Sequence, residues 1–279
     1  MTSSTLDALW SSQAIRFLHP AAVVCERVCR RVGRENLLDR VDLQVPVGAR
    51  LLLVAAPDAS ASLLLRILAG LAHADGGRFQ LAGALSRDAS PAGWARRIGY
   101  VGPEPGLFPW MSADETLKLA AQLIGLGRPD AQLQIDQAVE RWGLATGRER
   151  PMSRMGLAFM QRTAMAAALL GDPEVVLLDE PLRALDPVER ARLLRLPGER
   201  RTVVLASRYP ASEAGAVNQV AFLQRGRVEL HAPISAFQEL GLPLSMRSIE
   251  TLAGMVAVRR EAERRSSLKA NPVERTAST

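Results

Sequence analysis

Apolar residues in the first third of the chain come in short runs separated by turn residues, a pattern that predicts β-strands. The strands expected on this basis are 21–25, 37–45, 49–56, 76–83 and 96–102. The run at 49–56 is apolar on both faces, as expected of a buried parallel strand. The leucine-rich segment 63–71 is too apolar for a surface strand and predicts a mostly buried helix.

From Ser112 onward the apolar spacing becomes helical. Glu115 follows three residues later, which fits a capping box at a helix start. Helical patterning continues to about Leu170, with interruptions near 127–130 and 143–155. The remaining expected elements are strand 175–179, helix 187–196, strand 202–207, a short helix, and a hairpin over 220–230 that turns at Arg225 and Gly226.

This alternation of strands and helices predicts an α/β layered domain over residues 21–240. A helical subdomain of about 111–170 is expected as an insertion before the strand at 175. Residues 1–20 have weak periodicity and are expected to form an N-terminal extension. Residues 241–279 are expected to form a C-terminal extension that is helical over 246–266, and the last dozen or so residues are polar and expected to be disordered.

Composition narrows the class of protein without choosing a function. Of 279 residues, 48% are hydrophobic and 23% charged, as in ordinary globular proteins. No apolar run reaches the roughly 18–20 residues of a membrane span, and the N-terminus lacks the pattern of a secretory signal, which favours a cytoplasmic location. The net charge of +6 fits an acidic partner, an anionic membrane or nucleic acid. Cys25 and Cys29 are expected to be ordinary thiols, because roughly 13 Å would separate them on a strand.

The most specific chemical signal is the string EVVLLDEPLRALDP at 174–187. Four apolar residues followed by Asp179 and Glu180 describe a buried parallel strand that delivers two carboxylates to its C-terminal edge, where open α/β sheets bind ligands. In a phosphate-transfer site the first acid holds magnesium and the second orients the attacking water. Acids that only cap the next turn would show the same pair, but Pro181 and the ALDP that follows make the full string more specific.

Together with its neighbouring segments, this string resembles the nucleotide-binding subunit of ABC transporters. The similar segments are RRIGYVGPEPGLFPWMSADETL (96–117) for the Q-loop region, QRTAMAAALLGDPEVV (161–176) for the helix after the family signature, LLDEP and ALDP for the second acidic motif and D-loop, and VAFLQRGRVELHAPISAF (220–237) for the closing hairpin. The match covers roughly residues 22–240 in the family's order. The resemblance implies a P-loop NTPase-like ABC ATPase fold with a mixed sheet core, an antiparallel β subdomain and an inserted helical subdomain.

The same resemblance shows that the chain departs from the family at the phosphate loop. The family uses Gly-x-x-x-x-Gly-Lys-[Ser/Thr], in which glycines let backbone N–H groups close around the phosphates and lysine adds positive charge. The matching positions are Ala55, Ser60, Ala61 and Ser62, and an additional family glycine falls on Asp58. Only Ser62 keeps its expected type, and Asp58 is expected to place a carboxylate where phosphate would lie.

Other family positions are also replaced. Val32 occupies the position of the aromatic residue that would stack on adenine. Pro103 occupies the position of the Q-loop glutamine, and Arg208 occupies that of the switch histidine. The family signature Leu-Ser-Gly-Gly-Gln corresponds to Met155, Gly156, Leu157, Ala158 and Phe159. The signature serine and its following glycines, which would contact the γ-phosphate in a partner's site, are therefore absent from this segment.

These coordinated losses predict a catalytically degenerate subunit, a pseudo-ATPase that forms the structural or regulatory half of a membrane transporter. It would pair with an active sister ATPase, or with itself. One alternative is an active or weakly active transport ATPase with an unorthodox phosphate loop, and another is a soluble interaction module outside transport. Hydrolysis by this chain alone is not expected. ATP and Mg²⁺ are expected only in a composite site with a partner, because the resemblance implies sites shared across a dimer.

The retained polar residues each have two interpretations. Asp179 either accepts a hydrogen bond from Ser62 as part of the architecture or binds magnesium, and Glu180 is a vestigial catalytic position. Arg208 either supplies the charge of the lost lysine or forms a salt bridge to a local acid such as Asp58 or Glu180.

The resemblance also implies a transmembrane permease as partner, no nucleic acid, and a peripheral location on the inner face of the membrane. Phe108 and Trp110 lie near the groove where this family receives its membrane partner. They are expected either to anchor that partner or to pack internally at the helix start.

Overall fold

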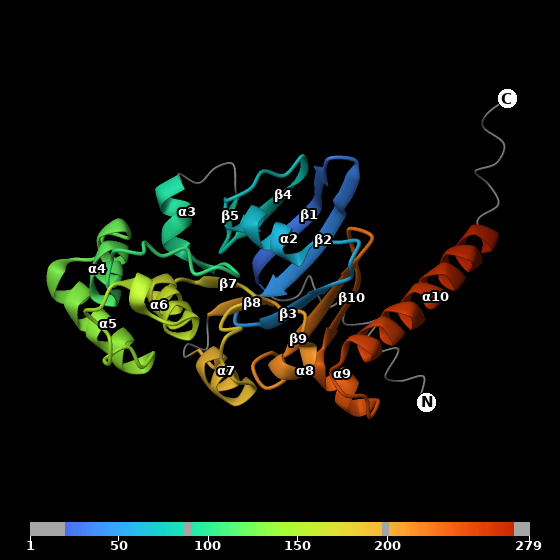
Figure 1. Ribbon diagram of the computed structural model, residues 1–279. Coiled ribbons are helices and arrows are strands. Elements are labelled where there is room, and N and C mark those ends of the chain that lie inside the picture. Colours follow the sequence, from blue (N-terminus) through green and yellow to red (C-terminus); the bar gives the residue numbers. More distant parts are fainter. Residues whose placement is uncertain (1–19, 86–90, 197–200, 271–279) are drawn as a thin grey trace.

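The computed structural model describes residues 20–85, 91–196 and 201–270, and its strands form two sheets (Figure 1). The strands of the smaller sheet are β1 (Ala21–Val32), β2 (Glu35–Pro46), β4 (Gly76–Leu81) and β5 (Ala84–Leu85). They pair antiparallel in the order β2-β1-β4-β5. This sheet is the expected antiparallel subdomain.

The larger sheet is mixed, and its strands position the residues of the candidate site. Its strands are β3 (Arg50–Ala55), β6 (Ile98–Val101), β7 (Val175–Asp179), β8 (Thr202–Ala206), β9 (Gln219–Gln224) and β10 (Arg227–Pro233). The order is β10-β9-β3-β8-β7-β6, and only the β9–β10 hairpin is antiparallel. Strands β7 and β8 are buried along their whole length, which explains their continuous apolar sequences.

The helices complete two hydrophobic cores on opposite faces of the larger sheet. Helix α2 (Ala61–Leu68) packs in a core shared with both sheets, and its four innermost apolar side chains are fully buried. The other face carries α4 (Ala113–Leu123), α5 (Arg128–Arg141) and α6 (Leu157–Leu169), which form the expected helical subdomain at the left of Figure 1. The remaining helices are α3 (Pro91–Arg97), η2 (Met152–Arg154), α7 (Pro187–Leu194), α8 (Pro210–Glu213), α9 (Ile234–Glu239) and α10 (Met246–Ala270).

The capping box predicted at Ser112 is confirmed. The Ser112 Oγ accepts the backbone N–H of Glu115 at 3.2 Å, and the Glu115 carboxylate accepts the backbone N–H of Ser112 at 2.8 Å. Two of the N–H groups at the start of α4 therefore have partners.

We expect Ser112→Ala to lower the free energy of unfolding by about 1 kcal/mol, because the N–H of Glu115 loses its acceptor. Urea denaturation of the purified chain measures this change. Ser153→Ala, a nearby exposed serine, serves as the matched control. Equal effects of the two substitutions would contradict the assignment of the cap.

Several expectations about the elements and their bounds need correction, including β1, which continues to Val32, and α7, which ends at Leu194. Helix α2 ends at Leu68 rather than near residue 71, because Gly70 adopts a left-handed φ of 76° that a helix does not contain. Helix α10 continues to Ala270, into the tail expected to be disordered, since no glycine or proline interrupts the sequence between 255 and Pro272. The sequence patterns also missed α3, β5 and α9. The extension 1–19 and the tail 271–279 lie outside the described residues.

The two cysteines are free, as expected. Burial raises the pKa of the Cys25 thiol to about 12, which leaves it as an unreactive core residue. Within the described ranges, no helix has the length and apolar character needed to cross a membrane.

Candidate functional site

The carboxyl ends of β3, β7 and β8 meet beside the start of α2 and surround a cavity of about 630 Å³. Such an edge is where parallel sheets bind ligands. The predicted site residues that line it are Ala55, Ser60, Ala61, Ser62, Pro103, Asp179, Glu180 and Arg208. The structure thus brings together most of the phosphate-loop and acidic positions that the sequence indicated.

The acidic strand end contacts the start of α2, as one interpretation expected. The Ser62 Oγ donates a hydrogen bond to the Asp179 Oδ1 at 2.8 Å. Asp179 is 1% exposed, and its Oδ2 has no hydrogen-bond partner in the described structure. Burial raises the pKa of this carboxyl, although the hydrogen bond from Ser62 opposes the shift. A buried carboxylate oxygen beside a serine hydroxyl is the kind of donor pair that Mg²⁺ accepts.

Glu180 is bound by Arg208, which confirms the interpretation of a local salt bridge. The backbone N–H of Arg208 donates to the Glu180 Oε1 at 2.9 Å, and its Nε reaches the same oxygen at 3.2 Å. Glu180 itself has a left-handed φ of 48°. This backbone conformation costs conformational energy for a residue other than glycine.

One backbone N–H at the helix start that follows the phosphate-loop segment 55–62 is occupied by a side chain of that segment. The Ser60 Oγ accepts the backbone N–H of Leu63 at 3.1 Å and caps α2. In a phosphate loop the donors at this helix start face the ligand. Ala61 supplies no charge to the cavity.

The expectation that the Asp58 carboxylate lies at the phosphate position is wrong. Asp58 does not line the cavity, and its Oδ1 accepts the backbone N–H of Arg225 at 3.1 Å. Arg225 has a left-handed φ of 52° in the β9–β10 turn. The carboxylate is therefore drawn to a hairpin distant in sequence, a contact that no local pattern indicates.

Arg183 and Met246 are among the cavity residues that sequence reasoning did not single out. Arg183 lines the cavity from the turn after β7 and donates from Nη2 to the Glu104 Oε1 at 2.6 Å, so both cavity arginines are paired with carboxylates. Met246, the first residue of α10, also lines the cavity. Their side-chain directions depend on the packing of the following turn and helix, which the local sequence does not specify.

The remaining predicted positions lie outside this cavity. Val32 is 50% exposed at the end of β1 and does not line the cavity. Gly156 is the N-cap residue of α6, without a side-chain cap, and Ala158 lies in the first turn of that helix. Further along α6, the Gln161 Oε1 accepts the backbone N–H of Ala184 at 3.0 Å, which ties this helix to the turn after β7.

Phe108 and Trp110 are exposed, so the interpretation of internal packing at the helix start is wrong. Their rings stack with centroids 5.2 Å apart, and 48% and 71% of the two residues are exposed. We call this pair the aromatic platform. Next to it a groove of about 510 Å³ runs between the 102–107 loop and α6, and shares Ser62, Pro103 and Asp179 with the larger cavity.

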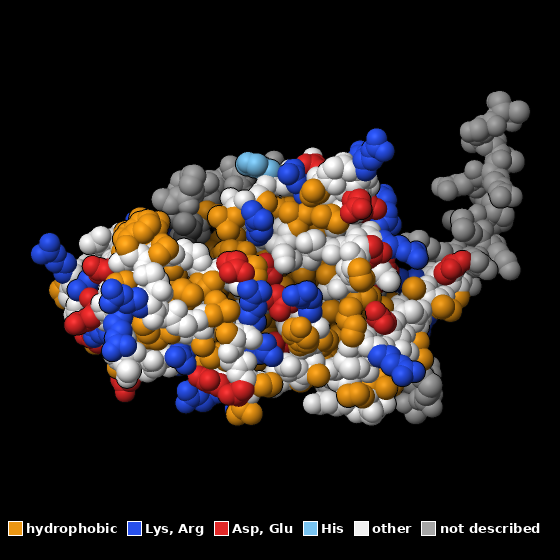
Figure 2. Space-filling model, viewed as in Figure 1, with side chains coloured by type: hydrophobic (Ala, Val, Ile, Leu, Met, Phe, Trp, Pro, Cys, Tyr) orange, Lys and Arg blue, Asp and Glu red, His pale blue; other side chains and the backbone are white. Residues whose placement is uncertain are grey.

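The described residues contain no group of three or more His, Cys, Asp or Glu side chains that could hold a metal ion, so Asp179 and the Ser62 hydroxyl are a partial set of ligands. On the face shown in Figure 2, basic side chains alternate with acidic and apolar ones and form no continuous basic surface.

Comparisons with known proteins agree with this arrangement. The family model described as "ABC transporter" matches residues 38–183. The chain is 30% identical over 213 residues to the aliphatic sulfonates import ATP-binding protein SsuB 1 of Mesorhizobium japonicum, covering 74% of this chain and 77% of that protein. It is 31% identical over 214 residues to the sulfate/thiosulfate import ATP-binding protein CysA of Mycobacterium bovis, covering 75% of this chain and 60% of that protein. A solved structure of an ATP binding subunit of an ABC transporter has a TM-score of 0.74 at 20% identity, covers 84% of this chain and 99% of its own, and shows the shared fold.

Proposed function

This chain belongs to the ABC transporter family as an ATP-binding subunit, and we propose that within this family it is a degenerate subunit that supports a transporter without hydrolysing ATP. In this proposal the chain pairs with a sister ATPase or a second copy, beneath a membrane permease at the inner face of the membrane. The substrate class of the transporter does not follow from these residues, and the substrates of the relatives are not assigned to it.

The observation that carries the proposal is the chemistry of the phosphate-loop segment. Ala61 stands where lysine would contribute positive charge, and the N–H of Leu63 is already taken by the Ser60 side chain. Arg208 and Arg183, on other walls of the cavity, each bind a carboxylate. An incoming triphosphate would therefore compete with two carboxylates for the positive charge of these arginines.

The residues of this cavity offer more suitable ligands for Mg²⁺ than for a triphosphate. Asp179 offers a buried oxygen without a hydrogen-bond partner, and Ser62 offers a hydroxyl beside it. When bound with nucleotide, the ion would neutralise phosphate charge at the strand end. These residues support the second candidate function, an active or weakly active transport ATPase with an unorthodox loop.

Thermal unfolding of the purified full chain with and without Mg-ATP separates the two candidates. Under our proposal, 1 mM Mg-ATP leaves the melting temperature unchanged, because a ligand stabilises a fold only when its concentration exceeds the dissociation constant. A clear rise that disappears in Asp179→Ala would reject the degenerate subunit and favour the ATPase. Mg²⁺ without nucleotide is the control that reveals cation binding alone.

The aromatic platform is our proposed anchor for the permease. An exposed stacked Phe108–Trp110 pair beside a groove is suited to an apolar helix, because aromatic side chains dominate the buried centres of protein interfaces. We expect Trp110→Ala to lose the permease in pull-downs. Leu133→Ala, at an exposed position on α5, is the control and should retain it.

A further inference from the structure

A separate cavity of about 740 Å³ lies between the smaller sheet, β10 and α10. Its lining residues come from β1 and β2, from β10 and from α10. None of them lines the cavity at the ends of β3, β7 and β8. Four of the nine lining residues are arginines, namely Arg27, Arg40, Arg227 and Arg260. We call this cavity the arginine cleft.

Two of these arginines stand at irregularities in the pairing of β1 with β2. Each strand carries one extra residue relative to the other, β1 within 26–27 and β2 within 39–40. Arg27 and Arg40 lie in these two bulges and have left-handed φ values of 52° and 55°. A bulge redirects side chains, and a left-handed φ costs conformational energy outside glycine. The fold therefore accepts backbone strain at two positions whose side chains line one cleft.

Neighbouring residues hold both bulges in place. The Asp42 Oδ1 accepts the backbone N–H of Arg27 at 2.9 Å. The Cys29 Sγ accepts the backbone N–H of Arg40 at 3.2 Å. Gly77 on β4 packs against the Arg27 carbonyl so closely that a Cβ there would lie 2.3 Å from its oxygen. The smaller sheet is thus built around the bulge on β1, and the direction of Arg27 is a fixed feature of the fold.

One carboxylate anchors two of the arginines. The Arg227 Nε and Nη2 donate to the Asp39 Oδ2 at 2.9 and 2.5 Å, and the Arg40 Nε donates to the Asp39 Oδ1 at 3.3 Å. Such charge-assisted bonds fix the direction of a guanidinium group. Three acidic residues share the cleft with the arginines, namely Asp42, Glu229 and Glu261. Their repulsion disfavours any anion that does not engage several arginines at once.

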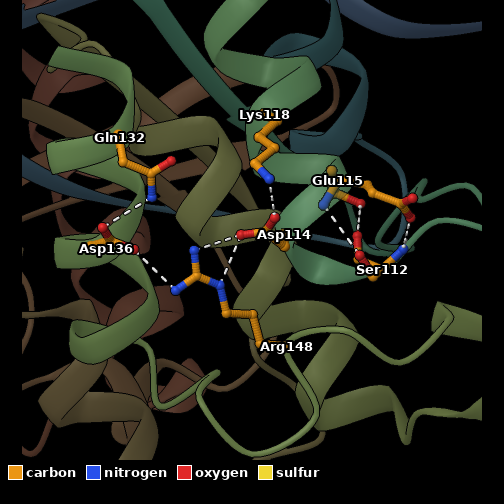
Figure 3. Close-up of polar contacts among 8 residues, drawn as sticks. Ser112, Asp114, Glu115, Lys118, Gln132, Asp136 and Arg148 are labelled. Atoms are coloured by element: carbon orange, nitrogen blue, oxygen red, sulfur yellow. Dashed lines mark hydrogen bonds and ion pairs between the residues drawn. The ribbon is translucent and has the colours of Figure 1, made fainter. Parts of the chain in front are cut away.

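The other two arginines of the cleft are uncommitted. The guanidinium groups of Arg27 and Arg260 form no hydrogen bond or ion pair with any residue that the structure describes. An arginine with a structural role looks different, since the Arg148 guanidinium binds both Asp114 on α4 and Asp136 on α5 (Figure 3). The cleft therefore holds two positive charges that have not found a carboxylate.

Helix α10 directs Arg260 toward the cleft. Val256 is 6% exposed and belongs to the core on the larger sheet. Arg260 follows it by four residues, and this spacing places both side chains on one face of the helix. Ala257 also lines the cleft from α10. An anion bound by Arg260 and Arg27 together would therefore join α10 to the smaller sheet.

We propose that the arginine cleft binds the phosphate groups of a small metabolite that carries at least two of them. Guanidinium groups bind phosphate oxygens through paired N–H donors, and about 740 Å³ is within the range of small-molecule sites. Two phosphates give Arg27 and Arg260 the partners they lack. Arg40 and Arg227 stay bound to Asp39 and line the same space. This binding fastens α10 to the smaller sheet, whether or not the chain hydrolyses ATP.

Isothermal titration calorimetry of the full chain with sodium pyrophosphate, in EDTA and without nucleotide, tests the proposal. The natural chain is expected to bind, and Arg27→Met with Arg260→Met to weaken binding about a hundredfold, because each loss removes hydrogen bonds to a charged group. Arg34→Met with Arg247→Met is the matched control. It removes the same charge from the β1–β2 turn and from α10, at exposed positions outside the cleft, and should keep the natural affinity.

Three results would overturn the proposal. They are no binding to the natural chain, equal weakening in the two double variants, and undiminished binding when Arg27 and Arg260 are both replaced. The last result would move pyrophosphate to another site, such as the phosphate-loop cavity, and the Mg-ATP test of the proposed function stands apart from it. If the variant with both substitutions does not fold, Arg260→Met alone should weaken binding about tenfold.

Hydrogen exchange measured by mass spectrometry tests the fastening of α10. With saturating pyrophosphate, the amides of residues 257–262 are expected to exchange about tenfold more slowly, because the bound anion ties this part of the helix to the smaller sheet. The amides of β8 serve as the internal control and should not change. Unchanged exchange over 257–262 would show that the anion does not join α10 to the sheet.

Discussion

Rebuilding the phosphate loop with Ala55→Gly, Ser60→Gly and Ala61→Lys is expected to raise the affinity of the chain for Mg-ATP by about a thousandfold. A lysine charge 4 Å from a phosphate contributes about 4 kcal/mol at an effective dielectric constant near 20, which corresponds to roughly a factor of a thousand in the dissociation constant. Glycine at position 60 also releases the N–H of Leu63 that the serine now occupies. Both changes act in the same direction.

Isothermal titration calorimetry measures this gain. The matched control carries the two glycines with Ala61→Met, which has similar length but no charge, and should recover only a small part of the affinity. Asp58 is left unchanged in these variants because its carboxylate binds the β9–β10 turn rather than the cavity. If the natural chain binds Mg-ATP as tightly as the rebuilt one, the proposal of a degenerate subunit fails.

Asp179→Asn is expected to stabilise the chain by about 1–3 kcal/mol at neutral pH in the absence of divalent cations. Because burial raises the pKa of Asp179, the folded protein holds its proton to a higher pH than the unfolded chain does. The free energy of unfolding therefore falls as pH rises from the unfolded pKa, near 3.9, through the folded pKa. Above the folded pKa the chain bears the full cost of a buried charged carboxylate. Asparagine removes the charge and still accepts the hydrogen bond from Ser62.

Urea denaturation in EDTA at several pH values tests this prediction. The advantage of Asp179→Asn should shrink as pH falls toward the unfolded pKa, since the natural carboxyl is then protonated in both states. Added Mg²⁺ should stabilise the natural chain and not the variant if Asp179 and Ser62 bind the ion. A variant less stable than the natural chain at pH 7 in EDTA would show that the charged carboxylate is favourable where it lies.

The sequence predicted the elements of the core because their patterns are local. Strands β7 and β8 are continuous apolar runs, and the Ser112 cap is encoded within four residues. The Ser62–Asp179 contact was also expected, since the order of family motifs placed both at one sheet edge. Patterns of this kind need no knowledge of tertiary packing.

Contacts set by tertiary packing were not predictable in the same way. Asp58 turns toward Arg225 because the β9–β10 hairpin presents an N–H there, and Met246 reaches the cavity because α10 packs on β9 and β10. The Arg183–Glu104 pair joins two turns 79 residues apart. Each side chain is flexible, and only the fold decides which of its directions is occupied.

The Ser60 cap on α2 has a consequence for how this chain persists when no nucleotide is present. Glycine-rich loops lose much conformational freedom on folding, and a bound ligand helps to offset that loss. Here alanine and proline restrict the unfolded loop, and the Ser60 side chain supplies one hydrogen bond at the helix start that follows it. Under the proposed function, the folded loop of this subunit would need no bound nucleotide to hold its shape.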